Sequence, residues 1–524
     1  MKRTFFTNAV VLTLTTQLLR VVGLFFIAFL SGRIGTEGIG LYQLTFSVYF
    51  LASTMASSGI GIAVSRLTAE SIGISGYKST SNVVRRAAAF SLFTGLLIGI
   101  VLFVFSGFIG TSLLGDHRSV ISLKTLSFGL PFMALSSCLR GYFYGVRKIL
   151  IPASQMIFEQ AVQLAIVLAI INSFASRGLE YSCLAIAVSS TITEALSCGY
   201  GFVLYILERN RSALAVKREK EINRQILSIS IPVAASSYLR AGLRTAENIL
   251  IPSGLRRHGS SEGAALSRFG LLGMAMPVLL FPSSFLTAIS ALLLPEISEA
   301  YSLKNAQKIK NIFSKVFQYT VMLSLLFSGI FISFAGDFGI LIYKNGDAGL
   351  LIMLLAPLVP LIYLDFIVDS MLNGLNQQVK TLKINILDYT LRIGLILILI
   401  PKYGFFVYIA IYYLSTMLNA FLSIRHLLLV SEAKLDFLVF VIKPLLAALA
   451  SGLSVKMLSK LIPLTEPSWL YLAFKIAVMA AMYTILLFLT RCFGKEDAAW
   501  LKSVMRPKPG GRNTGSENYQ SFYR

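Results

Sequence analysis

The chain has 524 residues, of which 56% are hydrophobic and only 14% are charged, far more apolar surface than a water-soluble core of this length needs. Its net charge of +23 does not indicate nucleic-acid binding, because the basic residues lie between apolar runs and not with aromatic residues on one surface. Four cysteines without C-x-x-C spacing and three histidines predict neither disulfides nor a metal site, and we expect no cofactor.

Apolar runs of about 20 residues, enough to cross roughly 30 Å of hydrocarbon, recur along the whole chain. The first run resembles a secretory signal, but it is too long for one and contains Arg20, so we expect it to be retained. The sequence predicts an all-α integral membrane protein. We place about fourteen spans, near residues 8–30, 39–64, 86–110, 122–145, 150–172, 181–207, 226–252, 265–294, 313–335, 348–372, 382–400, 403–428, 437–461 and 469–491.

Lysine and arginine favour alternate connections, which include the basic segment 208–224 and the tail that follows Arg491. The positive-inside rule therefore places both termini in the cytoplasm. We expect a multi-pass protein of the plasma membrane. The tail, residues 492–524, is polar and rich in glycine, a composition typical of disorder.

The chain also matches itself at an offset of 229 residues, without a gap across three spans. The matched pairs include Pro131 with Pro360, Gly145 with Gly374 and Glu159 with Asp388. Six spans separate the copies, so both insert in the same direction and are related by an axis along the membrane normal. We expect an N-lobe (1–207), a basic linker (208–225), a C-lobe (226–428), and two further spans (437–491) that could hold a lipid tail.

Several arginines are predicted to lie inside spans, where a charge costs several kcal/mol unless it faces a partner or water. Arg20 and Arg240 are mid-span repeat partners, and Arg268 enters the eighth span from the outer side. Arg244 and Glu247 lie on the same helix face as Arg240 and can pair with each other. Converging guanidinium groups would suit a diphosphate, whereas structural ion pairing is the competing interpretation.

The tenth span carries Asp365 and Asp369 on one polar stripe, and the repeat partner of Asp369 in the fourth span is Arg140. A salt bridge between Arg140 and Asp369 could close an inward gate. A cation site at the two aspartates and two solvated helix ends are the alternatives.

Three further carboxylates are buried in predicted spans. Asp388 and Arg392 are one turn apart and can pair within their helix, whereas Glu159 has only Gln163 at that spacing. Glu159 must therefore find a partner on another helix or cavity water, which makes it the stronger functional candidate. Glu194 is either a packing carboxylate or a residue that binds a coupling ion.

The segments "IGTEGIGLYQL" (34–44), "IAVSRLTAE" (62–70) and "ALLLPEISEA" (291–300) resemble the stage V sporulation protein B and polysaccharide-export family. This family belongs to the superfamily that contains the multidrug extruders and the lipid II flippase. The resemblance implies a flippase that moves undecaprenyl-diphosphate-linked sugars, such as lipid II, to the outer leaflet, for spore cortex in some members. It also implies that Arg20 and Arg268 line the cavity. The expected second-span arginine is absent, for which Arg240 and Arg244 could compensate.

Two other functions stay open at this point. A cation-coupled multidrug antiporter would share the fold, and a non-transporting scaffold of cell-wall synthesis is also compatible with the sequence. A membrane glycosyltransferase is disfavoured, because the chain has neither a large outer loop nor an acidic D-x-D motif. We therefore expect a transporter and not an enzyme, with a lipid-linked sugar, membrane lipids and a monovalent cation or proton as partners and no nucleic acid.

Overall fold

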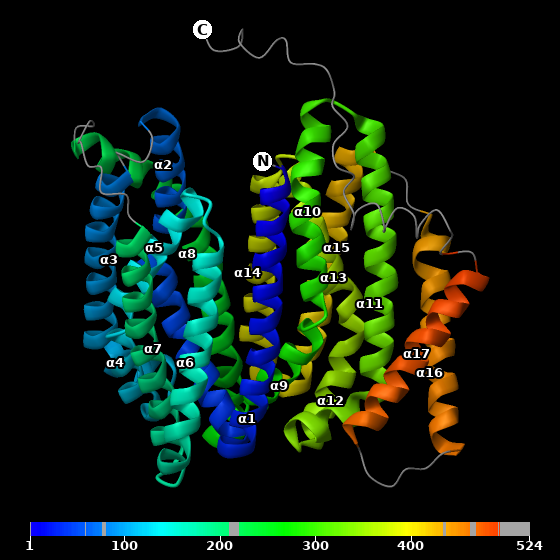
Figure 1. Cartoon of the computed structure of the whole chain (residues 1–524). Helices are drawn as coiled ribbons and strands as arrows, with labels where there is room; N and C mark the ends of the chain where they lie inside the picture. The colour runs from blue at the N-terminus through cyan, green and yellow to red at the C-terminus, as the bar shows by residue number, and fades with distance from the viewer. Residues whose placement is uncertain are drawn as a thin grey trace.

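The computed structural model describes residues 2–57, 59–75, 80–208, 219–432, 436–461, 468–490 and 492. Within these ranges nearly every residue is helical and none is in a strand, which confirms the all-α prediction (Figure 1). The longer helices are α1 (Lys2–Ser57), α2 (Ile60–Ser75), α3 (Thr80–Phe108), α4 (Val120–Ser127), α5 (Leu130–Gly145), α6 (Leu150–Ala175), α7 (Leu179–Glu208), α8 (Glu219–Arg257), α9 (Glu262–Leu280), α10 (Ser283–Ser302), α11 (Ala306–Tyr343), α12 (Gly346–Leu355), α13 (Val359–Gly374), α14 (Gln378–Tyr403), α15 (Phe405–Ser431), α16 (Lys443–Leu461) and α17 (Trp469–Leu489).

Twelve helical runs in the described ranges are long and apolar enough to cross a membrane, and the pair α4 and α5, bent by 47°, gives a thirteenth. The bend lies where Pro131 opens α5. The first run, Val11–Ile72, has 62 residues, or about 93 Å of helix. It reverses at Gly35, whose φ of 67° is left-handed, so it accounts for two of the expected spans. The fourteen predicted spans are all represented.

The helices form two groups (Figure 1). Helices α2–α7 pack together on one side and α9–α15 on the other, while α16 and α17 pack on α11 at the far edge. The main contacts between the groups run through α1 and α8. Because α8 packs on α2 and α3 as well as on α14, it belongs to both groups, and the lobe boundaries expected from the sequence stay a prediction.

The two groups meet most closely at the end of the molecule where the chain reverses at Gly35. A Cβ built on Gly40 of α1 would lie 2.1 Å from the carbonyl oxygen of Leu266 in α9. A Cβ on Gly270 of α9 would lie 2.0 Å from the carbonyl oxygen of Thr36 in α1. The backbones therefore touch, as small residues allow between membrane helices. This contact closes one end of the interface between the groups.

Replacing Gly270 with alanine should open this contact, because the added methyl group meets backbone that cannot move aside. We expect Gly270→Ala to lower the free energy of unfolding by about 1–3 kcal/mol, measured by thermal unfolding in detergent. Gly242→Ala is the matched control, since a Cβ on Gly242 meets nothing within 4 Å. Equal stability of the two variants would contradict the close contact.

Candidate functional site

A cavity of about 760 Å³ lies between the two groups, lined by α1, α8, α9, α13, α14 and α15. Its floor is the closed end of the interface, because Gln43 and Gly273 both line it and touch each other. The charged residues along its wall are Arg240, Arg244, Glu247, Asp365, Asp388 and Arg392. Arginine and carboxylate are thus equal in number, and what the cavity can bind depends on which of them are already paired.

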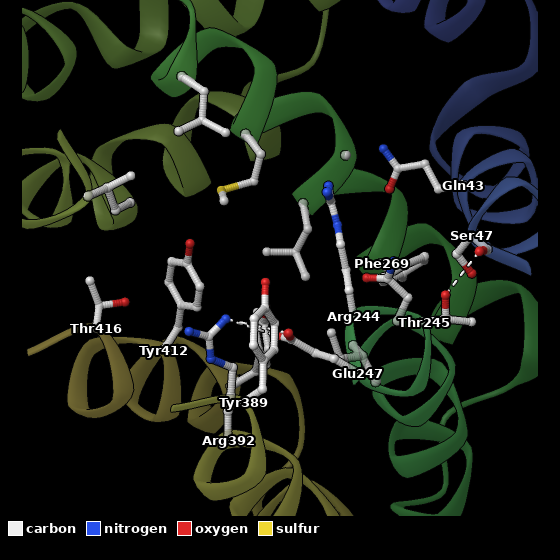
Figure 2. A pocket seen from close by; sticks show the side chains of 18 of the residues that line it. Gln43, Ser47, Arg244, Thr245, Glu247, Phe269, Tyr389, Arg392, Tyr412 and Thr416 are labelled. Atoms are coloured by element: carbon white, nitrogen blue, oxygen red, sulfur yellow. Dashed lines mark hydrogen bonds and ion pairs between the residues drawn. The ribbon is translucent and has the colours of Figure 1, made fainter. Parts of the chain in front are cut away.

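Arg392 of α14 is the centre of a buried ion cluster in this cavity (Figure 2). Its guanidinium lies 2.7 Å from Asp388, one turn earlier, and 3.3 Å from Glu247 of α8. The pairing of Asp388 with Arg392 is the one expected from their spacing. Ser415 of α15 accepts a hydrogen bond from Arg392 Nε at 2.9 Å and donates to Asp388. Three helices are thereby joined through one cation.

Aromatic side chains enclose this cluster. The guanidinium carbon of Arg392 lies 4.8 Å from the ring centre of Tyr412 and 5.3 Å from that of Tyr389, and Figure 2 shows the two rings flanking it. Tyr408 donates a hydrogen bond of 3.2 Å to Glu247. Because Arg392 is satisfied by two carboxylates, a hydroxyl and two rings, little of its charge is available to a ligand.

Arg240 and Arg244 differ from Arg392, because neither has a hydrogen-bond or ion-pair partner among the described residues. Both are exposed to the cavity, one turn apart on α8. The expected pair of Arg244 with Glu247 is wrong, since Glu247 turns to Arg392 and Tyr408. Arg244 lies over the ring of Phe50, at 5.9 Å, and extends away from Glu247 in Figure 2. Two free guanidinium groups thus face the cavity.

The other two predicted phosphate-binding arginines do not line this cavity. Arg20 is exposed on α1 and donates a hydrogen bond of 3.4 Å to Ser283 of α10. Arg268 is exposed near the start of α9 and donates one of 3.4 Å to Ser260. The expected convergence of Arg20, Arg240 and Arg268 is therefore absent from this conformation, because helix depth alone does not fix the direction in which a side chain points.

The predicted gate pair is not formed either. Asp369 accepts a hydrogen bond of 3.2 Å from Asn385, whereas Arg140 lies 3.2 Å from Glu159. Asp365 lines the cavity, and its Oδ1 atom has no hydrogen-bond partner in the described part of the chain. The repeat places Arg140 and Asp369 at equivalent depths. Each nevertheless finds its partner within its own group of helices: Arg140 is neutralised by Glu159, and Asp369 is hydrogen-bonded to Asn385.

Arg140 and Glu159 line a second cavity of about 770 Å³, formed by α1, α2, α5 and α6. Glu159 also accepts a hydrogen bond of 3.1 Å from Ser197 of α7. Its partner is therefore on another helix, one of the two possibilities that the sequence left open. Glu194 of α7 lies close to this pair and is buried.

An ion network at the closed end was missed by sequence analysis. Arg118 lies 2.8 Å from Asp116, 2.8 Å from Glu37 of α1 and 3.9 Å from Glu262 of α9. Arg256 of α8 donates a hydrogen bond of 2.7 Å to the carbonyl oxygen of Leu114. The network ties the two groups of helices together beside the glycine contacts. The internal repeat was the feature of the sequence that could have indicated this network, because Glu37 and Glu262 occupy matching positions in the segments "TEG" and "SEG".

Asp116, in the loop between α3 and α4, gives this network a pH dependence. Burial by itself would raise the pKa of Asp116, but the hydrogen bonds and charge of Arg118 outweigh burial and hold that pKa below its ordinary value. A carboxylate with a lowered pKa stabilises the folded form above its ordinary pKa, and loses that contribution as the pH falls through the lowered value. The network is therefore intact at neutral pH and weakens only in acid.

Solved structures with a similar fold were compared next. The chain matches the lipid II flippase MurJ in an inward closed conformation with a TM-score of 0.67 and 16% identity, over 91% of this chain and 98% of that one. It matches a multidrug resistance MATE family transporter in an inward-facing conformation with a TM-score of 0.61 and 15% identity, over 80% and 96%. The chain therefore shares the fold of these two membrane proteins.

Sequence comparison places the chain more narrowly. Residues 5–300, more than half of the chain, match the family described as polysaccharide biosynthesis protein, and the chain belongs to that family. It is 26% identical over 511 residues to stage V sporulation protein B of Bacillus subtilis (strain 168), covering 95% of this chain and 97% of the relative. It is 24% identical over 455 residues to the lipid II flippase MurJ of the same organism, covering 79% and 81%. The family resemblance expected from the sequence is confirmed.

Removing Arg392 should destabilise the protein, because Glu247 and Asp388 would be left buried without a cation. We expect Arg392→Met to lower the free energy of unfolding by about 3–5 kcal/mol, measured by thermal or denaturant unfolding in detergent. Adding Glu247→Gln and Asp388→Asn to that variant should recover most of the loss. Wild-type stability of Arg392→Met would show that the cluster does not hold the three helices.

Removing Arg118 should loosen the closed end of the cavity. In a Ser47→Cys reporter, whose thiol would line the cavity, we expect Arg118→Gln to raise labelling by a membrane-impermeant maleimide from the Gly35 side about tenfold. The loss of one charge-assisted hydrogen-bonding group, about 1.5–3 kcal/mol, accounts for that size. The four native cysteines are buried and add little background.

Arg66→Gln is the control for this labelling, because Arg66 makes an exposed pair with Glu70 within α2. It should leave the rate unchanged. Equal labelling of Arg118→Gln and Arg66→Gln would contradict a locking role for the network.

Proposed function

We propose that the protein is a flippase that moves an undecaprenyl-diphosphate-linked sugar, lipid II or a close relative, from the inner to the outer leaflet. The observation that carries the proposal is the pair of unpaired arginines, Arg240 and Arg244, on the cavity wall. Guanidinium groups keep their charge and bind phosphate oxygens in a two-pronged fashion. Two of them one turn apart match the two phosphates of a diphosphate.

The rest of the cavity supports a sugar headgroup next to the diphosphate. Gln43 and Asn248 offer amide groups that can both donate and accept hydrogen bonds, as sugar hydroxyls require. Tyr389 and Tyr412 add ring faces, against which sugar rings pack well. Arg392 takes no part in binding phosphate, because its carboxylate partners would repel the ligand.

The lipid tail would stay in the bilayer beside α16 and α17, whose outward side chains are largely apolar, among them Leu446, Leu449 and Leu453. The one lysine within α17, Lys475, pairs with Asp337 of α11 and lies 4.5 Å from the ring centre of Tyr471. Its charge is therefore neutralised, which suits an apolar groove for a prenyl chain.

The direction of transport follows from the expected orientation. With both termini in the cytoplasm, the closed end formed by Gly40, Gly270 and the Arg118 network faces outward, and the headgroup enters from the cytoplasmic side. The two groups of helices then rock about α1 and α8, the network separates, and the headgroup leaves on the outer side. No covalent step is needed.

The relatives support this substrate class. One is named a lipid II flippase and another a stage V sporulation protein, so a role in peptidoglycan made during sporulation is part of the proposal. The MATE transporter has the same fold, and Asp365 is an unpaired carboxylate in the cavity that could face a cationic drug. Unpaired arginines outnumber it, which favours an anionic headgroup.

Flipping of fluorescent lipid II in proteoliposomes tests the proposal. We expect the wild-type protein to make the lipid accessible to an outside quencher. Arg240→Gln combined with Arg244→Gln should slow flipping by at least about a hundredfold, because each lost charge-assisted contact is worth about 1.5–3 kcal/mol. Arg257→Gln, an exposed arginine at the end of the same helix and outside the cavity, should flip at the wild-type rate.

Two results would contradict the proposal. One is a double variant that flips lipid II as fast as the wild type. The other is a wild-type protein that leaves lipid II in place but exports cationic dyes from cells, which would assign the cavity to drug transport.

A further inference from the structure

Glu194 of α7 is a buried carboxyl group with an unsatisfied oxygen. It is 9% exposed, and its Oε2 atom has no hydrogen-bond partner in the part of the chain that the structure describes. A charged carboxylate in such a place within a membrane span costs several kcal/mol. Glu247 and Asp388 avoid that cost by sharing Arg392, which is not available to Glu194.

The groups that face Glu194 do not supply enough positive charge to neutralise its carboxylate. They are Glu159 of α6, Arg140 of α5, Tyr49 of α1 and Cys198 of its own helix. Arg140 lies 3.2 Å from Glu159. Among these groups two carboxyls therefore compete for one guanidinium, and the carboxyl that lacks it needs a cation or a proton of its own.

Water can reach this cluster from one side. Arg140 and Glu159 line the second cavity, whereas Glu194 does not line it but interacts electrostatically with both. Ser197, which donates a hydrogen bond of 3.1 Å to Glu159, is on α7 one turn after Glu194. A proton that arrives at Glu159 can therefore pass to α7, the helix that carries Glu194.

The ligand that fits this place is a proton. A divalent metal ion needs several oxygen ligands, usually more than one of them a carboxylate, and the described residues contain no group of three or more acidic, histidine or cysteine side chains that could hold one. A proton needs a single lone pair, which Oε2 of Glu194 offers. We propose that Glu194 is a proton-binding site that couples a proton gradient to transport.

In the conformation described, Arg140 neutralises Glu159 and the proton resides on Oε2 of Glu194. When the proton leaves through Glu159 to cavity water, Glu194 becomes charged and Arg140 moves between the two carboxylates. Tyr49 carries this change to α1, because it is on the same helix as Gly40 and Gln43, which form the closed end. Loss of the proton thus acts on the helix that joins the two groups.

Infrared difference spectroscopy of the purified full-length protein tests proton binding without a transport substrate. Titration from acid to alkaline pH should remove a carbonyl-stretch band of a protonated carboxyl in the wild type. That band should be smaller by the contribution of one carboxyl group in Glu194→Gln, which imitates the protonated form and should fold normally; Asp365, also unpaired, supplies what is left of it. Glu180→Gln, at the start of the same helix, should retain the full band. A band of wild-type size in Glu194→Gln, or no titrating band in the wild type, would overturn the site.

Coupling is tested separately and rests on the proposed function. A pH gradient across proteoliposomes can change the distribution of flipped lipid II by up to about a factor of ten per pH unit for each proton moved. The wild type and Glu180→Gln should show this dependence, whereas Glu194→Gln should flip independently of the gradient. Equal gradient dependence in Glu194→Gln would refute coupling. Absence of lipid II flipping in every protein would contradict the proposed function, while the infrared result would still decide proton binding.

Discussion

A charge inside the hydrocarbon layer must face either a partner or water, and that constraint organises the interior of this protein. Arg392 is the clearest case, because it joins α8, α14 and α15 through Glu247, Asp388 and Ser415. Since those carboxylates are fully occupied with Arg392, the nearby Arg240 and Arg244 keep their charge for a ligand. In the proposed function, the charges that stay unpaired set the specificity of the cavity, because its total charge is balanced.

The same constraint separates the two ends of the transport path. At the end near Gly35, Glu37 and Glu262, which occupy matching places in the internal repeat, both approach Arg118. Backbone contact through Gly40 and Gly270 lies beside them. The two repeat-related segments, one in α1 and one in α9, thus contact each other across the interface. Their contact closes this end, while the cavity beyond it stays wide. In the proposed mechanism, rocking about α1 and α8 separates this contact.

The fold was largely predictable from the sequence, because span length and residue-type periodicity depend on local chemistry. The internal repeat was predictable because the two copies still match in sequence at one offset. The pair of Asp388 with Arg392 was predictable because the two residues are one helical turn apart. The partners of Arg140 and Glu247 were not, because they depend on how helices rotate against each other. Arg268 shows the same limit, since its depth was clear from sequence but its direction was not. The contacts of Arg118 could not be predicted either, because they depend on the position of the short loop between α3 and α4.

The central claim is that Arg240 and Arg244 hold the diphosphate of a lipid-linked sugar. An experimental density map of the protein with bound undecaprenyl-diphosphate sugar tests it most directly. The account predicts phosphate density within hydrogen-bonding distance of both guanidinium groups, with the sugar toward Tyr389 and the tail outside the cavity. Phosphate density at Arg20 or Arg268, with Arg240 and Arg244 left free, would contradict it.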